Sequence, residues 1–279
     1  MSDIDFTRPE AVIDLARYPL DRPKDPGLVE TVKRLRAKLD RDQYCELPHF
    51  ITEAARLRAI ADANAALPMG HDNSARRNCY LQRAADPDLP ADHPRNMMLE
   101  ASTRMLAADL LPADSPLKTL YYWEPTRRLI AAIVGEETLY VNEDPMQPVN
   151  TVCYRDGDRS AWHFDSVNAF TMTLMLQEPE SGGDFQIWPN TRADDDQCYD
   201  RVARVLKGEA DDGIRTVARE AGALCLFRGC NSLHRVSPVR GDRLRVMGVF
   251  VYETEPGVIG DPQVNETVYG AREPRMTVG

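Results

Sequence analysis

The sequence has no pair of cysteines at the close spacing of a metal or disulfide motif. Six cysteines are scattered over 279 residues, and none forms a Cys-x-x-Cys pair. Zinc knuckles and small disulfide-stapled domains both depend on such regular spacing. We therefore expect reduced thiols that lie mostly in the core, at Cys45, Cys79, Cys153, Cys198, Cys225 and Cys230.

Long apolar runs and an excess of positive charge are missing as well. No stretch approaches the roughly 20 apolar residues that span a bilayer, and residues 1–6 lack the basic, apolar start of a signal peptide. The net charge of -10 disfavours binding to nucleic acid or anionic lipid. These absences predict a cytoplasmic protein with a small-molecule partner, no nucleic-acid partner and no membrane contact. A homodimer is compatible with the sequence.

The pattern of apolar residues divides the chain near residue 115. Residues 1–115 are mainly helical, with apolar positions every three or four residues over Leu28–Leu39 and with Thr52 as the N-cap of a second helix. Tyr44–Leu47 is a short extended piece between them. Gly70–Arg95 is polar and irregular, and we expect it to form a loop over a pocket. This region is predicted to pack on a core formed by residues 116–279.

Short strand-like runs dominate that second part. A helix over Pro125–Val134 ends at Gly135 and packs on the sheet, and a helical insertion near 194–209 interrupts the strands. The runs suit a double-stranded β-helix, or jelly roll, so the predicted fold class is mainly β with helices, its core preceded and buttressed by N-terminal helices. The expected strands are Thr138–Val141, Val149–Tyr154, Ser160–Asp165, Phe170–Leu176, Asp184–Trp188, Ile214–Val217, Ala223–Phe227 and Arg243–Tyr252.

Two histidines and one aspartate form the most informative pattern. On one expected strand, alternation directs His163 and Asp165 to the same face. The third residue, His234, comes after the strand and turn over Ala223–Gly229. Two imidazoles and a carboxylate hold Fe(II) on one face and leave the other open for a co-substrate and O2. A bare His-x-Asp arises often by chance, so the interpretation depends on the residues that come after His234.

A pair of arginines after His234 supplies that support. Arg243 and Arg245 lie on one face of the last long strand by alternation. A guanidinium binds a carboxylate through two parallel hydrogen bonds, which lysine cannot do. Such a residue at the inner end of the sheet is what 2-oxoglutarate requires.

With these residues, Asn150–Tyr252 resembles the Fe(II)/2-oxoglutarate-dependent oxygenases. The resemblance implies that His163, Asp165 and His234 bind Fe(II), and that Arg245, or else Arg243, binds 2-oxoglutarate. It also implies hydroxylation of an unactivated carbon with O2, releasing succinate and CO2. Tyr154 is a further candidate for 2-oxoglutarate binding, with core packing as the alternative.

A narrower resemblance connects the chain to the halogenases and hydroxylases of free amino acids. It is carried by Phe170–Gln177, Gly182–Phe185 and Pro189. The halogenases of that group have a small residue at the position of Asp165, where chloride binds the iron. A carboxylate there implies hydroxylation, and an amino acid or derivative is the expected substrate. Candidate substrate residues are Asn150, Ser166, Asn142, Arg76 and Arg77.

Two other functions remain open. Tyr154–Gly157 before Trp162–Asp165 also resembles nucleic-acid demethylases of the same superfamily, although Val249 stands where that group has a further arginine. A non-catalytic jelly roll with a bound metal is the other alternative. A closed zinc site would need a fourth protein ligand and would give the arginines no role. The remaining histidines, His49, His71 and His93, are expected to be solvated rather than metal-binding.

Overall fold

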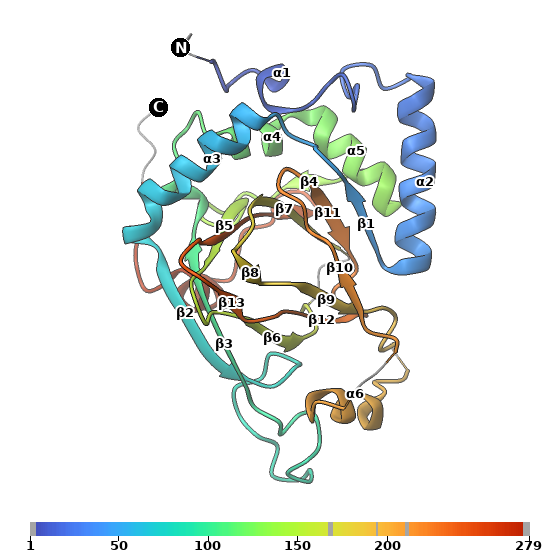
Figure 1. Ribbon diagram of the computed structural model, residues 1–279, viewed down its shortest axis with the longest axis vertical. Helices are drawn as coiled ribbons and strands as arrows, with labels where there is room; N and C mark the ends of the chain where they lie inside the picture. Colours follow the sequence, from blue (N-terminus) through green and yellow to red (C-terminus); the bar gives the residue numbers. More distant parts are fainter. Residues whose placement is uncertain (1–3, 167–169, 194, 210–211, 276–279) are drawn as a thin grey trace.

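Two antiparallel sheets that face each other form the centre of the molecule (Figure 1). The computed structural model describes residues 4–166, 170–193, 195–209 and 212–275. Among these, the larger sheet has seven strands and the smaller has four, and every pair is antiparallel. This arrangement confirms the predicted jelly roll.

The strands of both sheets come from distant parts of the chain. The larger sheet has the spatial order β1 (Tyr44–Leu47), β11 (Leu224–Phe227), β7 (Thr171–Gln177), β14 (Arg245–Phe250), β5 (Val149–Tyr154), β3 (Leu99–Leu106) and β2 (His71–Arg77). The smaller sheet has the order β10 (Arg215–Val217), β9 (Phe185–Trp188), β12 (Leu233–Val236) and β6 (Ser160–His163). Two further ribbons pair β13 (Val239–Arg240) with β8 (Ser181–Gly182) and β15 (Tyr252–Glu253) with β4 (Tyr140–Val141).

Helices cover the outer face of the larger sheet, at the top of Figure 1. The main hydrophobic core lies between them and this sheet and includes Leu39, Leu120 and Leu174, all fully buried. The smaller sheet has α6 beside it at the opposite end of the molecule. The helices are α1 (Pro9–Val12), α2 (Pro26–Asp42), α3 (Glu53–Ala66), α4 (Pro116–Tyr122), α5 (Glu124–Val134), α6 (Tyr199–Leu206) and α7 (Pro262–Tyr269), with short 3₁₀ turns at Leu67–Met69 and Ala108–Leu110.

The ends of these helices are set by local chemistry. The Asp25 carboxylate accepts hydrogen bonds from the first backbone N–H groups of α2, and Thr52 accepts one from Ala55 at the start of α3. Gln43 and Gly135 end α2 and α5 in the left-handed conformation, which glycine adopts without strain. The predicted helices at Leu28–Leu39, after Thr52 and over Pro125–Val134 are therefore confirmed, as is a helix within the insertion near 194–209.

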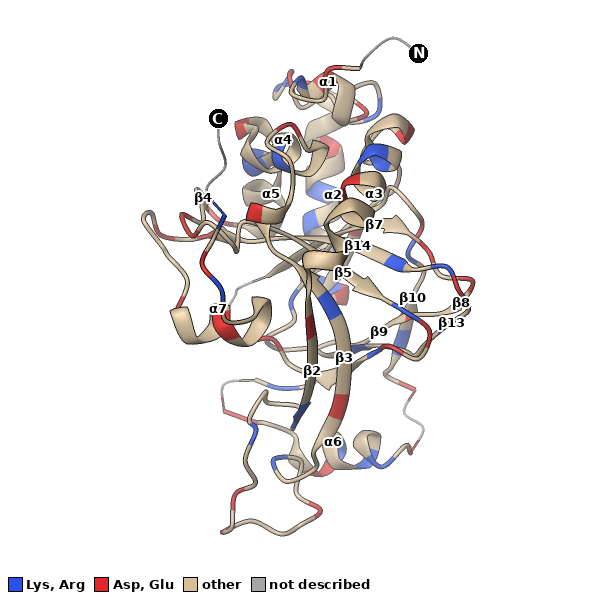
Figure 2. Ribbon diagram, turned by 90° about the vertical axis from the view of Figure 1, so that its left-hand side faces the viewer, with Lys and Arg blue, Asp and Glu red and all other residues tan. Residues whose placement is uncertain are grey.

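The expectation of a loop over Gly70–Arg95 is wrong for its first part. His71–Arg77 forms β2, which pairs with β3 in a hairpin that extends the larger sheet (Figure 2). Burial alternates along β2, but its side chains are polar or small on both faces. The period of two in hydrophobicity that identifies a strand is therefore absent from the sequence. Only the segment from Asn78 onward is irregular, up to β3.

The strands around the candidate ligands also differ from the prediction. β6 ends at His163, so Asp165 lies in the segment after the strand rather than on it. His234 belongs to β12, a separate strand of four residues that was not among the expected strands. β12 pairs with β6 so that His234 lies directly opposite His163.

The sequence predicts neither a membrane span nor a disulfide. None of the described helices is both long and apolar enough to cross a membrane. All six cysteines are free thiols, and four of them, Cys45, Cys79, Cys153 and Cys225, are buried.

The core between the helices and the larger sheet gives a first prediction. Leu39→Ala in α2 removes a fully buried side chain and should lower the free energy of unfolding by about 2–5 kcal/mol. Leu57→Ala in α3 is the matched control, because Leu57 is 53% exposed, and it should cost no more than about 0.5 kcal/mol. Urea unfolding followed by circular dichroism measures both, and equal losses would contradict this packing of α2 on the sheet.

Candidate metal and co-substrate site

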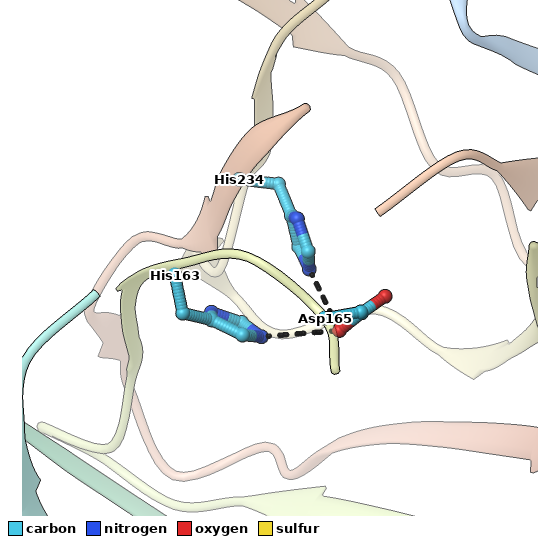
Figure 3. Close-up of side chains that lie close together, drawn as sticks. All are labelled: His163, Asp165 and His234. Carbon is cyan, nitrogen blue, oxygen red and sulfur yellow. Dashed lines mark ion pairs between the residues drawn. The ribbon is translucent and has the colours of Figure 1, made fainter. Parts of the chain in front are cut away.

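Three side chains converge between the two sheets (Figure 3). The Nε2 atoms of His163 and His234 lie 3.6 and 3.4 Å from Oδ1 of Asp165. One ligand atom from each residue lies within 4.8 Å of the others, and this is the one cluster of at least three potential metal ligands among the described residues. His49, His71 and His93 are not part of it. The predicted ligand set is therefore brought together by the fold.

Backbone carbonyls fix both imidazoles. Nδ1 of His163 lies 2.8 Å from the carbonyl oxygen of Ala161, and Nδ1 of His234 lies 2.9 Å from that of Ser232. A carbonyl can only accept, so each Nδ1 carries the hydrogen and each Nε2 presents its lone pair to the site. The ring of Phe227 also packs edge-on against His234, with the ring centres 5.0 Å apart.

The carboxylate of Asp165 is held just as closely. The hydroxyl of Thr171 on β7 donates a 2.5 Å hydrogen bond to Oδ2, which leaves Oδ1 to face the imidazoles. The backbone N–H of Asp165 donates to the carbonyl of Gly229. A Cβ on Gly229 would collide with Oδ2 of Asp165, so the position requires glycine for lack of space.

Charge within the cluster suits metal binding. Burial, followed by the nearby His234, lowers the pKa of His163 to about 3, so its imidazole is neutral at pH 7. Burial alone would raise the pKa of Asp165, but the two imidazoles and Thr171 hold it below its usual range. The pKa of His234 is raised by Asp165 against the effect of burial. A metal ion binds the neutral form of an imidazole, so its binding would oppose this rise in the pKa of His234.

A cavity of about 130 Å³ extends from these ligands between the two sheets. It is smaller than the roughly 300–1,000 Å³ of sites for drug-sized ligands and suits a small acid. Both sheets contribute apolar and aromatic walls, and three arginines lie in the same lining, of which Arg219 and Arg245 are buried. The lining residues are Tyr154, Ser160, His163, Asp165, Thr171, Thr173, Phe185, Arg219, Phe227, His234, Arg235, Val236, Arg245, Met247 and Val249.

Of the two arginines predicted for 2-oxoglutarate, the fold directs only Arg245 into this cavity. Arg245 is completely buried on β14, and its Nε donates to the carbonyl oxygen of Gly183. Burial lowers its pKa to about 10, which leaves it charged at neutral pH. Tyr154 faces it from β5, with the guanidinium carbon 5.0 Å from the ring centre. Arg243, the other candidate, is exposed outside the cavity and donates to the carbonyl of Pro179.

A second buried arginine in the cavity was missed by the sequence analysis. Arg219 comes after β10, is 8% exposed, and donates a 2.6 Å hydrogen bond to the hydroxyl of Thr173. It stands in a segment without a recognisable motif. A buried position for an arginine outside any motif is not visible from sequence alone.

The two arginines predicted to bind substrate, Arg76 and Arg77, lie on opposite faces of β2. Arg77 is half-buried, and the charge of Asp165 acts on it. None of the described residues forms a hydrogen bond or ion pair with its guanidinium. Arg76, one residue earlier, is exposed, as alternation along a strand requires, and neither arginine is part of the cavity lining.

The other predicted substrate residues lie outside the cavity lining. Asn142 is buried and donates to the carboxylate of Glu253, which supports the ribbon of β4 and β15. Asn150 on β5 donates to the carbonyl of Gln147. Ser166 is exposed just after Asp165. The substrate roles predicted for Asn142, Asn150 and Ser166 stay predictions, and none of the three lines the cavity.

The donor set fits a metal ion with an open coordination face. Two imidazole nitrogens and one carboxylate oxygen, with no fourth protein ligand in the described cluster, are the set found in non-haem Fe(II) oxygenases. The buried, unpaired nitrogen Nη2 of Arg245 in the same cavity gives a carboxylate co-substrate a partner. Fold and site together define the class: an oxygenase of the Fe(II)/2-oxoglutarate superfamily.

Comparison with known proteins identifies the family. Residues 29–268 match the model of the family described as Halogenase D, and the chain belongs to that family. A search of curated protein sequences found no match.

Solved structures share the fold at low identity. AviO1 from Streptomyces viridochromogenes Tue57 is 16% identical with a TM-score of 0.54, covering 82% of this chain and 97% of that chain. The epimerase SnoN, solved with Fe3+, alpha ketoglutarate and nogalamycin RO, is 16% identical with a TM-score of 0.54, covering 84% and 93%. A 2OG-Fe(II) oxygenase family oxidoreductase from Burkholderia pseudomallei is 14% identical with a TM-score of 0.51, covering 81% and 92%.

The close approach of Gly229 to Asp165 gives a prediction about metal affinity. Gly229→Ala should displace the carboxylate and weaken Fe(II) binding by about 10- to 100-fold, measured by anaerobic calorimetry. Gly248→Ala is the matched control, because an added Cβ on that strand comes no closer than 3.4 Å to the side chains of Phe250 and Leu117 around it. Equal affinities in the two variants would show that Asp165 does not bind the metal.

The hydroxyl of Thr171 provides a gentler test of the same ligand. Thr171→Val keeps the shape of the side chain but removes the hydrogen bond to Oδ2, and should lower Fe(II) affinity about tenfold. Thr216→Val, on the exposed part of β10, should leave the affinity unchanged. An unaltered affinity in Thr171→Val would mean that this hydrogen bond does not orient the ligand.

Proposed function

We propose that the protein is an Fe(II)- and 2-oxoglutarate-dependent hydroxylase of a small molecule, and that its substrate is a free amino acid or derivative. The observation that carries the proposal is the position of Asp165. Its Oδ1 lies within 3.6 Å of both imidazole Nε2 atoms, at the place of a third ligand. A smaller residue at this position would leave a coordination position open for a halide, and the carboxylate of Asp165 fills that position. Membership of the Halogenase D family is thus compatible with oxygen rather than halogen transfer.

The chain's residues supply orientation around the metal. The carbonyls of Ala161 and Ser232 hold the two imidazoles, and Thr171 holds the carboxylate, so no ligand has to reorganise when the metal binds. Fe(II) bound there supplies the activation of O2 at the expense of 2-oxoglutarate. Apolar side chains in the lining, Phe185, Phe227, Met247 and Val249 among them, exclude water from the reacting groups.

Arg245 is the residue that we assign to the distal carboxylate of 2-oxoglutarate. It is charged, completely buried and directed into the cavity, and its Nη2 has no hydrogen-bond partner. An unpaired buried charge is costly, so the cavity favours an anionic ligand. Tyr154 covers the guanidinium from β5 and keeps it in place. A purely structural metal site would give Arg245 no role.

For the substrate we assign Arg77. Its half-buried guanidinium lies close enough to Asp165 for the two charges to interact, and no described residue pairs with it. An arginine at the edge of a metal site suits the carboxylate of an amino acid, which it binds through two hydrogen bonds.

Product analysis tests the reaction type. Amino acids are incubated with the protein, Fe(II), 2-oxoglutarate and O2 in buffer that contains chloride. The expected result is one substrate that gains one oxygen atom by mass, with one succinate formed per product. Asp165→Ala should lose this activity, because it removes a metal ligand. Products that gain chlorine in the wild type, or full hydroxylation by Asp165→Ala, would refute the assignment.

Substitution of two adjacent arginines, one at a time, tests the assignment of Arg77 to the substrate. Arg77→Met should raise KM for the amino acid by at least about tenfold, which corresponds to the loss of one charge-assisted hydrogen-bond pair, and should leave KM for 2-oxoglutarate unchanged. Arg76→Met makes the same chemical change on the exposed face of β2 and should alter neither constant. Steady-state kinetics measure both, and similar KM values for the two variants would exclude Arg77 from substrate binding.

A further inference from the structure

Two arginines, rather than one, lie buried in the cavity. Arg245 on β14 is completely buried, and Arg219 after β10 is 8% exposed. Each guanidinium lies over an aromatic ring: Arg245 is 5.0 Å from the ring centre of Tyr154, and Arg219 is 5.3 Å from that of Phe185. One cation thus comes from the larger sheet and the other from the segment that follows β10 of the smaller sheet, and both line the same small cavity.

Neither cation forms an ion pair in the described part of the chain, although Glu46 attracts Arg219 from beyond ion-pair distance. No carboxylate lies within ion-pair distance, 4.0 Å, of either guanidinium there. Nη2 of Arg245 and Nε of Arg219 are buried without a hydrogen-bond partner. Asp184 attracts Arg245 from beyond that distance. It is exposed and accepts a hydrogen bond from Ser237. Buried charges are normally paired, so these two require an anion from outside the chain.

The two guanidiniums are close to each other. Nη2 of Arg219 lies 3.8 Å from the sulfur of Met247, and Nη1 of Arg245 lies 3.7 Å from the same sulfur. The positive charge of Arg219 also contributes, after burial, to the lowered pKa of Arg245. Two like charges this close repel each other, and an anion bound by both would offset that repulsion.

We propose that Arg219 and Arg245 together bind the distal carboxylate of the co-substrate, so that Arg219 is a second residue that selects a dicarboxylate. This inference rests on the proposed function, which assigns 2-oxoglutarate to the cavity through Arg245 alone. Two guanidiniums together offer enough donors to satisfy both oxygens of one carboxylate, and each added charge-assisted hydrogen bond favours that carboxylate over a methyl group.

β7 connects this second arginine to the metal ligands. Thr171 donates to Asp165, and Thr173, two residues later on the same face, accepts from Arg219. A single strand therefore positions both the carboxylate that binds the metal and the guanidinium that binds the co-substrate. Arg219 is held by a hydroxyl and not by an acid, which keeps its full charge available for the ligand.

The experiment compares two co-substrates that differ only in the distal group. Anaerobic calorimetry on the Fe(II)-loaded protein gives dissociation constants for 2-oxoglutarate and for 2-oxopentanoate, which has the same carbon chain without the second carboxylate. The ratio of the two constants measures selection for that carboxylate. The variants are Arg219→Met, Arg245→Met and the control Arg215→Met, an exposed arginine on β10 whose side chain pairs with Asp42.

Arg219→Met is expected to lower the preference for 2-oxoglutarate by at least about tenfold, while Arg215→Met leaves it unchanged. If Arg219 had a purely structural role, Arg219→Met would weaken the binding of both co-substrates alike and leave their ratio unchanged. An unchanged ratio in Arg219→Met, together with a lost preference in Arg245→Met, would overturn this inference and leave the proposed function intact. A wild type that does not prefer 2-oxoglutarate would instead refute the proposed function. Where Arg219→Met fails to fold, Arg219→Gln, which keeps a donor for Thr173, is judged by the same ratio.

Discussion

The pairing of β6 with β12 is the constraint on which the site depends. It sets His163 opposite His234 on the inner face of the smaller sheet, and the backbone carbonyls that orient both rings belong to residues within or directly before these two strands. A slip of one residue would turn an imidazole to the other face. Register and ligand orientation are therefore one property of the fold. Asp165 completes the set because the chain leaves β6 immediately after His163 and passes under Gly229.

Charge inside the cavity opposes the charge of the whole molecule. The chain has a net charge of -10, yet two buried guanidiniums line the cavity of the metal ligands and form no ion pair with any described acid. Apolar and aromatic side chains around them lower the local dielectric, which strengthens their attraction for an anion. This arrangement costs folding stability in the empty protein, and binding of a dicarboxylate offsets that cost. Val246 and Phe250 of β14, the strand that carries Arg245, pack into the core with the helices on the larger sheet.

The sequence predicted those parts of the site in which residue type and short spacing decide the chemistry. His163, Asp165 and His234 are recognisable from the ligand preferences of Fe(II), and Arg245 from its distance to His234. Arg219 could not be predicted, because only the packing of sheet on sheet buries it. The hairpin of β2 and β3 was missed because the residues of β2 are polar or small on both faces, and without that strand Arg76 and Arg77 could not be told apart. Hydrophobic periodicity identifies a buried face, and these features lack one.

A carboxylate ligand within the Halogenase D family is the central claim, and the metal's own surroundings test it most directly. X-ray absorption at the iron edge of the protein loaded with Fe(II) and 2-oxoglutarate, in chloride buffer, reports the atoms bound to the metal. The structure predicts nitrogen and oxygen neighbours only, with two imidazoles from His163 and His234 and one carboxylate from Asp165. A chloride neighbour in the wild-type protein would contradict this assignment of the ligands.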